Sequence, residues 1–511
     1  MQIQIIMSTR YITLLCSLVI LLTAGCKSSF LDKYPLDQPS AENFWHTEDD
    51  IKLALTGCYA PLSVNQDQSV AEGFGAFTIY WDAISDNAYP RNGNFVNIAL
   101  GQLEATSGGI VNDWYNLNYQ AIASCNYFLA NADKVPLDAN TLAQYKAEVH
   151  FLRAYYYFQL TNIYGGVIIT LQPEQLDYMK GKPKNSKAEV MNLVLADLDT
   201  AIQHLPDGPY SGRVVKGAAL GFKARVLLYN SSFAEAAATA KQVIDGGQFH
   251  LYDSYYGLFV KPGQTNNPEI MFSARYQLPN MFSTLDYQMG WDQWERVQPI
   301  KSLVDAYECT DGLPISQSPL YDPAHPYEHR DPRLRRTVYV PGDPWKYSAD
   351  GIFDPSKDGN NRTGFLVKKY LDTSRAPTNY STRSDQDFVL LRYADILLMY
   401  AEAQNETSGP DQSVYDAVNA VRARPGVNMP PLPAGLSQTD MRQRIRQERR
   451  VEFALEGTRY FDLLRWRTAK DVLSAIVNPG GAHRQFLDKN YLFPFPQSEV
   501  DIYGIEQNMG Y

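Results

Sequence analysis

The sequence predicts a mainly α-helical protein in which irregular helix pairs of the tetratricopeptide type form a superhelical scaffold, with a loop-rich region that binds the ligand. Apolar residues recur every three or four positions in long segments such as 112–133 and 147–166, which is the period of an amphipathic helix. Ala224 is followed nine residues later by Phe233 and twelve residues later by Ala236. This small, aromatic, small spacing is typical of a tetratricopeptide helix pair.

A second helix pair is indicated by the segment 391–406 and the segment 413–427 that follows it. No repeat of fixed length is visible, so we expect irregular pairs separated by insertions rather than a regular solenoid. Any other helical bundle would show the same periodicity and is the alternative. Between residues 246 and 387, Pro, Gly, Asn and Asp become frequent and the helical period fades, which predicts loops.

The segment 445–466 combines an apolar helical face with many charged residues. Gly457 interrupts it, which predicts one helix that ends near Glu456 and a second that begins near Thr458. Arginine and carboxylate side chains three or four residues apart on a helix normally form ion pairs. We therefore interpret these charges as structural, because nothing in their pattern requires catalysis.

The first 25 residues have the pattern of an export signal. Arg10 precedes a mostly apolar run of about 12 residues, which is too short to span a bilayer. Either Met1 or Met7 fits as the start of the chain. Cys26 follows small residues as in a bacterial lipobox, so we expect it to become the lipidated N-terminus; ordinary cleavage that leaves an incidental thiol is the alternative.

Local patterns after Cys26 predict how the mature chain begins. Residues 26–45 contain two prolines, which forbid a continuous helix and favour an extended tether. Thr47 and Asp50 then have the spacing of a capping box that opens a helix, and Ser186 and Glu189 have the same spacing further along the chain. Both sites are predicted helix starts.

Cysteine usage does not indicate a disulfide framework. Once the signal is removed and Cys26 is lipidated, Cys58, Cys125 and Cys309 remain. Three cysteines at irregular spacing, with no CxxC motif, are typical of buried thiols rather than of paired cysteines or a zinc site.

Composition and motifs argue against several classes of function. The formal net charge is −10, and no basic face is apparent, so we expect no nucleic-acid partner. His325 and His329 are separated by a proline, and no HExxH, phosphate loop or GxSxG motif occurs. We therefore expect no catalytic residue, no metal and no cofactor. A glycosidase needs a pair of carboxylates, but with 56 acidic residues some pairs occur by chance. Carboxylate pairs therefore do not by themselves support a glycosidase.

Aromatic residues point to a polar ligand with a flat apolar face. The chain contains 35 Tyr, 22 Phe and 7 Trp. A sugar has an apolar C–H face and a rim of hydroxyls, so rings with Asn, Asp or Arg at their edges are its natural complement. Such residues gather in three turn-rich segments, 85–95, 289–294 and 343–347. The candidate ligand-binding residues there are Tyr89, Arg91, Asn92, Trp291, Trp294, Trp345 and Tyr347.

Each candidate also has a structural interpretation. Trp81 is in step with Phe77 and Ile84, so we assign it to the core. Trp291 and Trp294 are three residues apart and would share one face of a helix, so packing is as good an interpretation as ligand binding. The expectation for Tyr89, Arg91, Asn92 and Trp345 is that their side chains are exposed.

Long segments spread over nearly the whole chain resemble one family. They are the lipobox cysteine followed by FLD, WYNLNYQAIASCNYF, AEVHFLRAYYYFQLTNIYGG, KGAALGFKARVLLY, LLRYADILLMYAEAQNE, ERRVEFALEGTRYFDLLRW, and LFPFPQSEVDI with QNMGY. In this order they resemble the SusD/RagB family of Bacteroidetes outer-membrane lipoproteins.

The resemblance implies a non-enzymatic lipoprotein held in the outer membrane by Cys26, with its body outside the cell. It would bind oligo- or polysaccharide and deliver it to a SusC-like TonB-dependent transporter. RagB-type peptide binding is the alternative, and a surface glycoside hydrolase is a more distant one. The implied divisions are a signal peptide at 1–25, the tether at 26–45, an N-terminal SusD-like helical region at 46–245 and a C-terminal RagB/SusD region at 246–511. No ligand contact is carried over, because binding residues differ between members.

Overall fold

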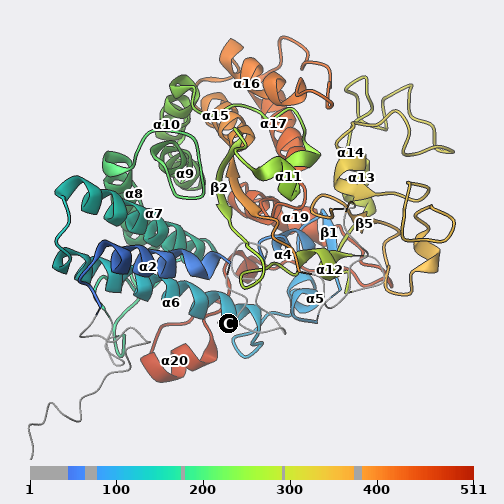
Figure 1. The fold of residues 1–511 in the computed structure, drawn as a ribbon. Helices are drawn as coiled ribbons and strands as arrows, with labels where there is room; N and C mark the ends of the chain where they lie inside the picture. The colour runs from blue at the N-terminus through green and yellow to red at the C-terminus, as the bar shows by residue number, and fades with distance from the viewer. Residues whose placement is uncertain are drawn as a thin grey trace, which may run out of the picture.

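A computed structural model describes residues 44–63, 77–91, 93–173, 179–290, 294–372, 374 and 383–511. Within these ranges the protein is mainly helical, as the sequence predicts (Figure 1). The export signal, Cys26 and nearly all of the predicted tether lie outside the described residues.

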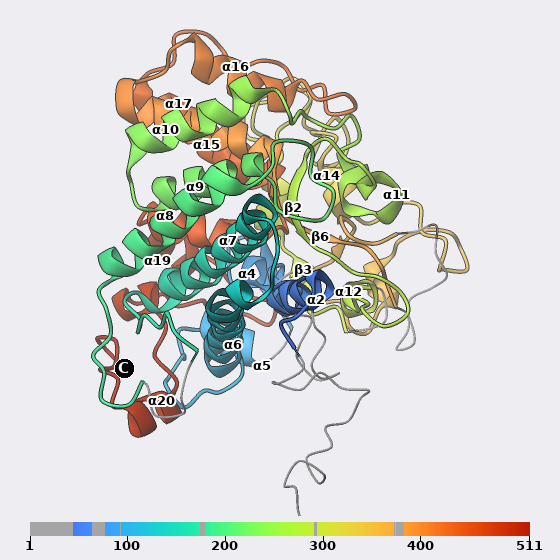
Figure 2. The ribbon, with the colours of Figure 1, turned by 60° about the vertical axis from the view of Figure 1, so that its left-hand side comes forward.

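Helices of the N-terminal half stack in chain order. Each of α6, α7, α8, α9 and α10 packs against the next, and α10 then packs against α15. Figure 2 shows them rising from α6 to α16, with α2 beside α6 and α7. The bounds are α2 Glu48–Tyr59, α4 Tyr80–Ala83, α5 Gly93–Ala99, α6 Ile110–Asn131, α7 Ala139–Tyr164, α8 Lys187–His204, α9 Lys216–Tyr229 and α10 Phe233–Gly246.

Local signals place the ends of these helices. The Thr47 hydroxyl accepts from the Asp50 N–H while the Asp50 carboxylate accepts from the Thr47 N–H, which confirms the predicted capping box. Ser186 and Glu189 make the same reciprocal pair at the start of α8. The helix pair predicted around Phe233 is also confirmed, because α9 packs against α10.

The C-terminal helices complete the stack. Their bounds are α15 Tyr393–Ser408, α16 Gln412–Arg422, α17 Gln438–Glu452, α18 Arg459–Arg465, α19 Ala469–Ser474 and α20 Gln497–Tyr503. The helix predicted from residue 391 begins two residues later than expected, since Phe388–Arg392 forms strand β6. That strand pairs with β2, and its buried backbone groups are thereby hydrogen-bonded.

The segment predicted to be loop-rich contains short elements joined by turns. The strands form three antiparallel pairs: β1 Ala88–Pro90 with β3 Val297–Pro299, β2 Ile270–Ala274 with β6, and β4 Val338–Tyr339 with β5 Leu366–Val367. The short helices are α11 Lys261–Gln264, α12 Leu285–Met289, α13 Lys301–Ala306 and α14 Leu334–Thr337. In Figures 1 and 2 these loops lie on the opposite side of the molecule from α8.

Gly457 forms the turn between α17 and α18, as predicted, but α17 ends at Glu452 rather than near Glu456. The backbone of Gly457 has a φ of 75°, a region that favours glycine. A Cβ atom at this position would lie 2.1 Å from the carbonyl oxygen of Thr78. The close approach brings the Gly457 N–H to the buried carboxylate of Asp82, to which it donates a hydrogen bond. Any side chain here would push the two segments apart.

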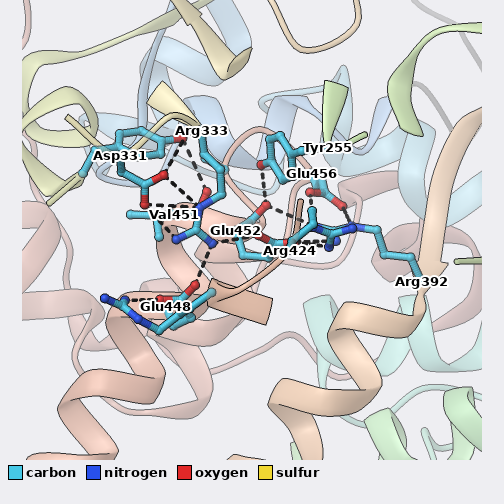
Figure 3. Close-up of polar contacts among 12 residues, drawn as sticks. Tyr255, Asp331, Arg333, Arg392, Arg424, Glu448, Val451, Glu452 and Glu456 are labelled. Carbon is cyan, nitrogen blue, oxygen red and sulfur yellow. Dashed lines mark hydrogen bonds and ion pairs between the residues drawn. The ribbon is translucent and has the colours of Figure 1, made fainter. Parts of the chain in front are cut away.

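The charges of α17 form a buried network around the Glu452 carboxylate (Figure 3). It accepts hydrogen bonds from Arg333 at 2.8 Å, from Arg392 at 2.7 Å and from Arg424 at 2.9 Å. Arg333 precedes α14, Arg392 ends β6 and Arg424 follows α16, so one carboxylate connects three separate segments. The structural interpretation of these charges is confirmed, although the partners are remote in sequence rather than three or four residues away.

Further carboxylates balance the same arginines. Arg392 contacts Glu269 at 2.8 Å and Glu456 at 2.8 Å, and the ammonium of Lys369 contacts Glu456 at 2.7 Å. Burial by itself would raise the pKa of Glu452, but the three guanidinium groups outweigh burial and hold that pKa well below its usual range. The Glu452 carboxylate is therefore ionised at neutral pH.

Predicted core residues lie where the sequence places them. Trp81 is 1% exposed and packs edge-to-face on Trp114, with ring centroids 5.1 Å apart. Cys58, Cys125 and Cys309 are buried free thiols, as expected. Burial raises the pKa of the Cys125 thiol well above its usual value, and the neighbouring Cys58 thiol raises it further.

We expect Glu452→Gln to lower the free energy of unfolding by about 3 kcal/mol or more, because it leaves three buried guanidinium groups around a neutral amide. Asp305→Asn is the matched control. It removes a carboxylate from an exposed ion pair with Lys301 and should cost less than about 1 kcal/mol. Denaturant titration of the full chain measures both values, and equal effects of the two substitutions would contradict the central role of Glu452.

Candidate functional site

Pairing of β1 with β3 brings two of the predicted aromatic segments together. Tyr89 lies opposite Gln298, and the backbone N–H of Arg91 donates to the carbonyl of Arg296 at 3.0 Å. These strands are about 200 residues apart in the chain. Their pairing places Arg91 beside Trp294.

The Arg91 side chain clamps three segments. Its guanidinium donates to the carbonyl of Trp294 at 2.8 Å and to the Asn360 side-chain oxygen at 2.6 Å. Both contacts come from turns with no helical or sheet hydrogen bonding of their own. One planar, permanently charged donor group can therefore hold two irregular loops against the end of β1.

Trp294 presents an accessible ring at this junction. Its side chain is 36% exposed, and the guanidinium of Arg296 lies 4.8 Å from its ring centroid, within range of a cation–π contact. The residue is in a turn, so the interpretation that it packs as part of a helix face is wrong. We define the loop face as Tyr89, Arg91, Trp294, Arg296 and Asn360.

A buried layer of side chains supports the loop face from below. Gln298 donates to the Asn360 carbonyl at 2.9 Å and accepts from the Arg362 N–H at 2.8 Å. The buried carboxylate of Glu295 accepts from Gln298 at 3.3 Å and from Asn361 at 3.2 Å. These bonds fix the 358–364 loop against β3, so the exposed groups above it are preorganised.

The expectation that Trp345 is exposed is wrong. Its side chain is only 2% exposed and packs edge-to-face on Tyr339 of β4 at 4.7 Å and on Tyr347 at 4.9 Å. The 341–353 loop folds back on itself through hydrogen bonds such as Trp345 N–H to the Gly351 carbonyl at 2.8 Å. A long loop can bury a large ring under its own backbone, which leaves no face of Trp345 for a sugar.

The other candidates have mixed outcomes. Tyr89 and Tyr347 are half-buried. Trp291 and Asn92 lie outside the described residues, as does Cys26, and their roles stay predictions. Sequence reasoning missed Arg296, although it lies only two residues after Trp294. It also missed Asn360, which reaches this surface only through tertiary contacts. The Asn-rich composition of the 358–362 segment was the only signal for Asn360.

The loop face has the chemistry of a surface that binds a polar ligand with a flat apolar face. It combines one accessible aromatic ring, with the Arg296 guanidinium over it, and the Arg91 and Asn360 side chains, which meet next to the Trp294 backbone. In the described part of the chain no group of three or more His, Cys, Asp or Glu residues could hold a metal ion. Among the same residues, no helix combines the length and the apolarity needed to cross a membrane.

Comparison with known proteins identifies the family of this chain. The model of the SusD family matches residues 261–511, and a model described as starch-binding associating with outer membrane matches residues 29–228. The chain belongs to the SusD/RagB family. As a SusD/RagB protein it is a member of a carbohydrate-binding family rather than an enzyme, which confirms the expectation that the protein is not catalytic.

Relatives cover nearly the whole SusD/RagB chain. SusD-like protein P38 of Formosa agariphila is 27% identical, over 88% of this chain and 90% of the relative. A crystal structure of a SusD-like carbohydrate binding protein from Bacteroides fragilis has a TM-score of 0.80 and 28% identity, and covers 90% of this chain and 99% of that one. A laminarin binding SusD-like protein shares the fold, with a TM-score of 0.73, 22% identity and coverage of 91% and 100%.

Proposed function

We propose that this protein binds an oligo- or polysaccharide at the loop face and delivers it to a SusC-like TonB-dependent transporter. The accessible Trp294 ring, flanked by Arg296 and held beside Arg91, carries the proposal. A sugar ring can stack on the indole while its hydroxyls accept hydrogen bonds from the guanidinium groups. Membership of a carbohydrate-binding family supports the same ligand class.

Preorganisation supports binding at this surface. The Arg91 clamp and the Gln298 and Glu295 contacts hold two loops in place before a ligand arrives, the turn at Trp294 and the 358–364 loop. A rigid surface loses less conformational entropy on binding than mobile loops would. Trp291 and Asn92 adjoin the loop face in sequence and remain proposed contacts.

The cellular setting is the second part of the proposal. Cys26, lipidated after signal cleavage, anchors the chain in the outer membrane with its helical body facing the exterior. The matched family description, which names association with the outer membrane, supports this location. A binding protein on that surface needs a channel to move its ligand inward, so a barrel transporter is the partner that completes the function.

We expect Trp294→Ala to weaken glycan binding by about two- to tenfold, since stacking of this kind contributes roughly 0.5–1.5 kcal/mol beyond area burial. The measurement is a titration of the full chain in detergent against oligosaccharides chosen from a glycan array. Tyr127→Ala is the control, because Tyr127 is 45% exposed on α6, away from the loop face. A peptide pool is titrated in parallel. Binding of peptides without binding of glycans would replace the glycan proposal with RagB-type peptide recognition.

Cys26→Ala should release the protein from the membrane fraction, because several acyl chains bury enough CH₂ groups to make attachment effectively permanent. Immunoblots of membrane and supernatant fractions measure the distribution. Ser28→Ala, two residues away, should leave the protein in the membrane fraction. An unchanged distribution for Cys26→Ala would disprove lipid anchoring at this residue.

Affinity purification of the lipidated chain from detergent-solubilised outer membrane should recover a TonB-dependent transporter. Mass spectrometry identifies the recovered proteins, and a mock purification from cells that lack the tagged chain defines the background. Recovery of the lipoprotein alone, under conditions that keep other outer-membrane complexes intact, would contradict the transporter partnership.

A further inference from the structure

A cavity of about 710 Å³ lies between the helical stack and the C-terminal segment. We call it the C-terminal pocket and define it by Asn162, Lys187, Tyr229, Phe461, Arg467 and Tyr491. These residues come from α7, the start of α8, the end of α9, α18 and the turns that follow it, and the segment near residue 490. Figure 2 shows α8, α9 and the C-terminus on the side of the molecule away from the loops around β3 and α12.

Two cations of the C-terminal pocket lack an anionic partner. In the described part of the chain, neither Lys187 nor Arg467 forms an ion pair, although most arginines of this protein are paired. The protein atoms around the Lys187 ammonium remove part of its hydration, and this lowers the pKa of Lys187. The positive charge of Arg467 lowers that pKa further. Two like charges that line one pocket without a counter-charge favour the arrival of an anion.

The remaining charges of the pocket are neutralised. Arg465 donates to Glu402 at 2.7 Å and to Asp462 at 2.8 Å. Lys489 is paired with Glu104 at 3.0 Å, and Asp488 is paired with Lys470 at 3.1 Å. The unbalanced charge of the pocket is therefore positive and is located at Lys187 and Arg467.

Neutral polar groups and an apolar wall complete the lining. Among the described residues, neither the Asn162 amide nor the Tyr229 hydroxyl has a hydrogen-bond partner, and both line the cavity. Burial raises the pKa of Tyr229 to about 12, so its hydroxyl remains protonated and able to donate. Phe461, Leu464 and Leu492 supply apolar surface on the same cavity. A ligand that fits has both an apolar face and several hydroxyls.

From these observations we propose that the C-terminal pocket is a second ligand site, which binds an acidic sugar such as a hexuronic acid unit. The carboxylate meets Lys187 and Arg467, the hydroxyls meet Asn162 and Tyr229, and the C–H face of the ring contacts Phe461 and Leu464. The volume is well above that of an inorganic anion and lies in the range of small-molecule sites. The site is separate from the loop face and does not depend on the ligand bound there.

Titration of the full chain in detergent with methyl β-D-glucuronide and methyl β-D-glucoside tests the proposal. These probes differ only at C6, which is a carboxylate in the glucuronide and a hydroxymethyl group in the glucoside. The glucuronide should bind and the glucoside should bind at least about tenfold more weakly, as expected for loss of a charge-assisted hydrogen bond. Inorganic phosphate, as a third probe, should bind more weakly than the glucuronide. Equal affinities for the two glycosides, tighter binding of phosphate, or no binding of the glucuronide would overturn the proposal.

Substitutions in the C-terminal pocket test whether the glucuronide binds there. Lys187→Gln and Arg467→Gln should each weaken glucuronide binding about tenfold, and Tyr229→Phe, which keeps the ring, about threefold. Lys187 and Arg467 are exposed at the pocket, so these substitutions leave the core unchanged, and circular dichroism verifies the fold. Lys241→Gln, an exposed lysine on α10, and Trp294→Ala on the loop face should leave the affinity unchanged. Glucuronide affinity that falls with Trp294→Ala but not with the pocket variants would assign the acidic sugar to the loop face and overturn the proposal.

Discussion

The fold depends on the charge balance around Glu452. A buried carboxylate or guanidinium is costly unless its hydrogen bonds and its counter-charge are both provided. Glu452 meets this requirement only when Arg333, Arg392 and Arg424 are all in place. Those arginines come from the loop-rich segment, the β2–β6 pair and the end of the helical stack. The network therefore forms only when the separate parts of the chain have reached their final arrangement.

This constraint explains how a segment with few regular elements can hold its shape. Strands β1, β3, β4 and β5 have only two or three residues each, and isolated pairs of that size are marginal in water. Arg333 joins this segment to Glu448 and Glu452 on α17 at 2.6 and 2.8 Å. These buried ion pairs attach the loop-rich segment to the helical side of the molecule.

The two surfaces with ligand-binding chemistry differ in how they are built. The loop face is made of turns that are clamped by Arg91 and supported by Gln298. The C-terminal pocket is made of helix ends and lies against the scaffold itself, with its two unpaired cations at Lys187 and Arg467. We propose a glycan as the ligand of the first surface and an acidic sugar as the ligand of the second. Together they would allow one protein to recognise two parts of a mixed polysaccharide.

Local patterns in the sequence determined the helices, the capping boxes at Thr47 and Ser186, the turn at Gly457 and the core position of Trp81. Such features depend on residues within a few positions of one another, or on a side-chain period that can be read along the chain. The family was also apparent from motif order. The exposure of individual rings could not be predicted from the sequence, since Trp294 and Trp345 occur in similar turn-rich contexts yet are 36% and 2% exposed.

Tertiary structure alone decided which distant residues meet. The contacts of Arg91 with Trp294 and Asn360 span 203 and 269 residues, and those of Glu452 with Arg333 and Arg392 span 119 and 60. The sequence shows the charge and the size of each of these residues. It does not show the partner of each residue, because a chain of this length contains many arginines and carboxylates that could pair. Packing of the helices and pairing of the short strands select the partners, because a buried carboxylate such as that of Glu452 is costly unless counter-charges reach it.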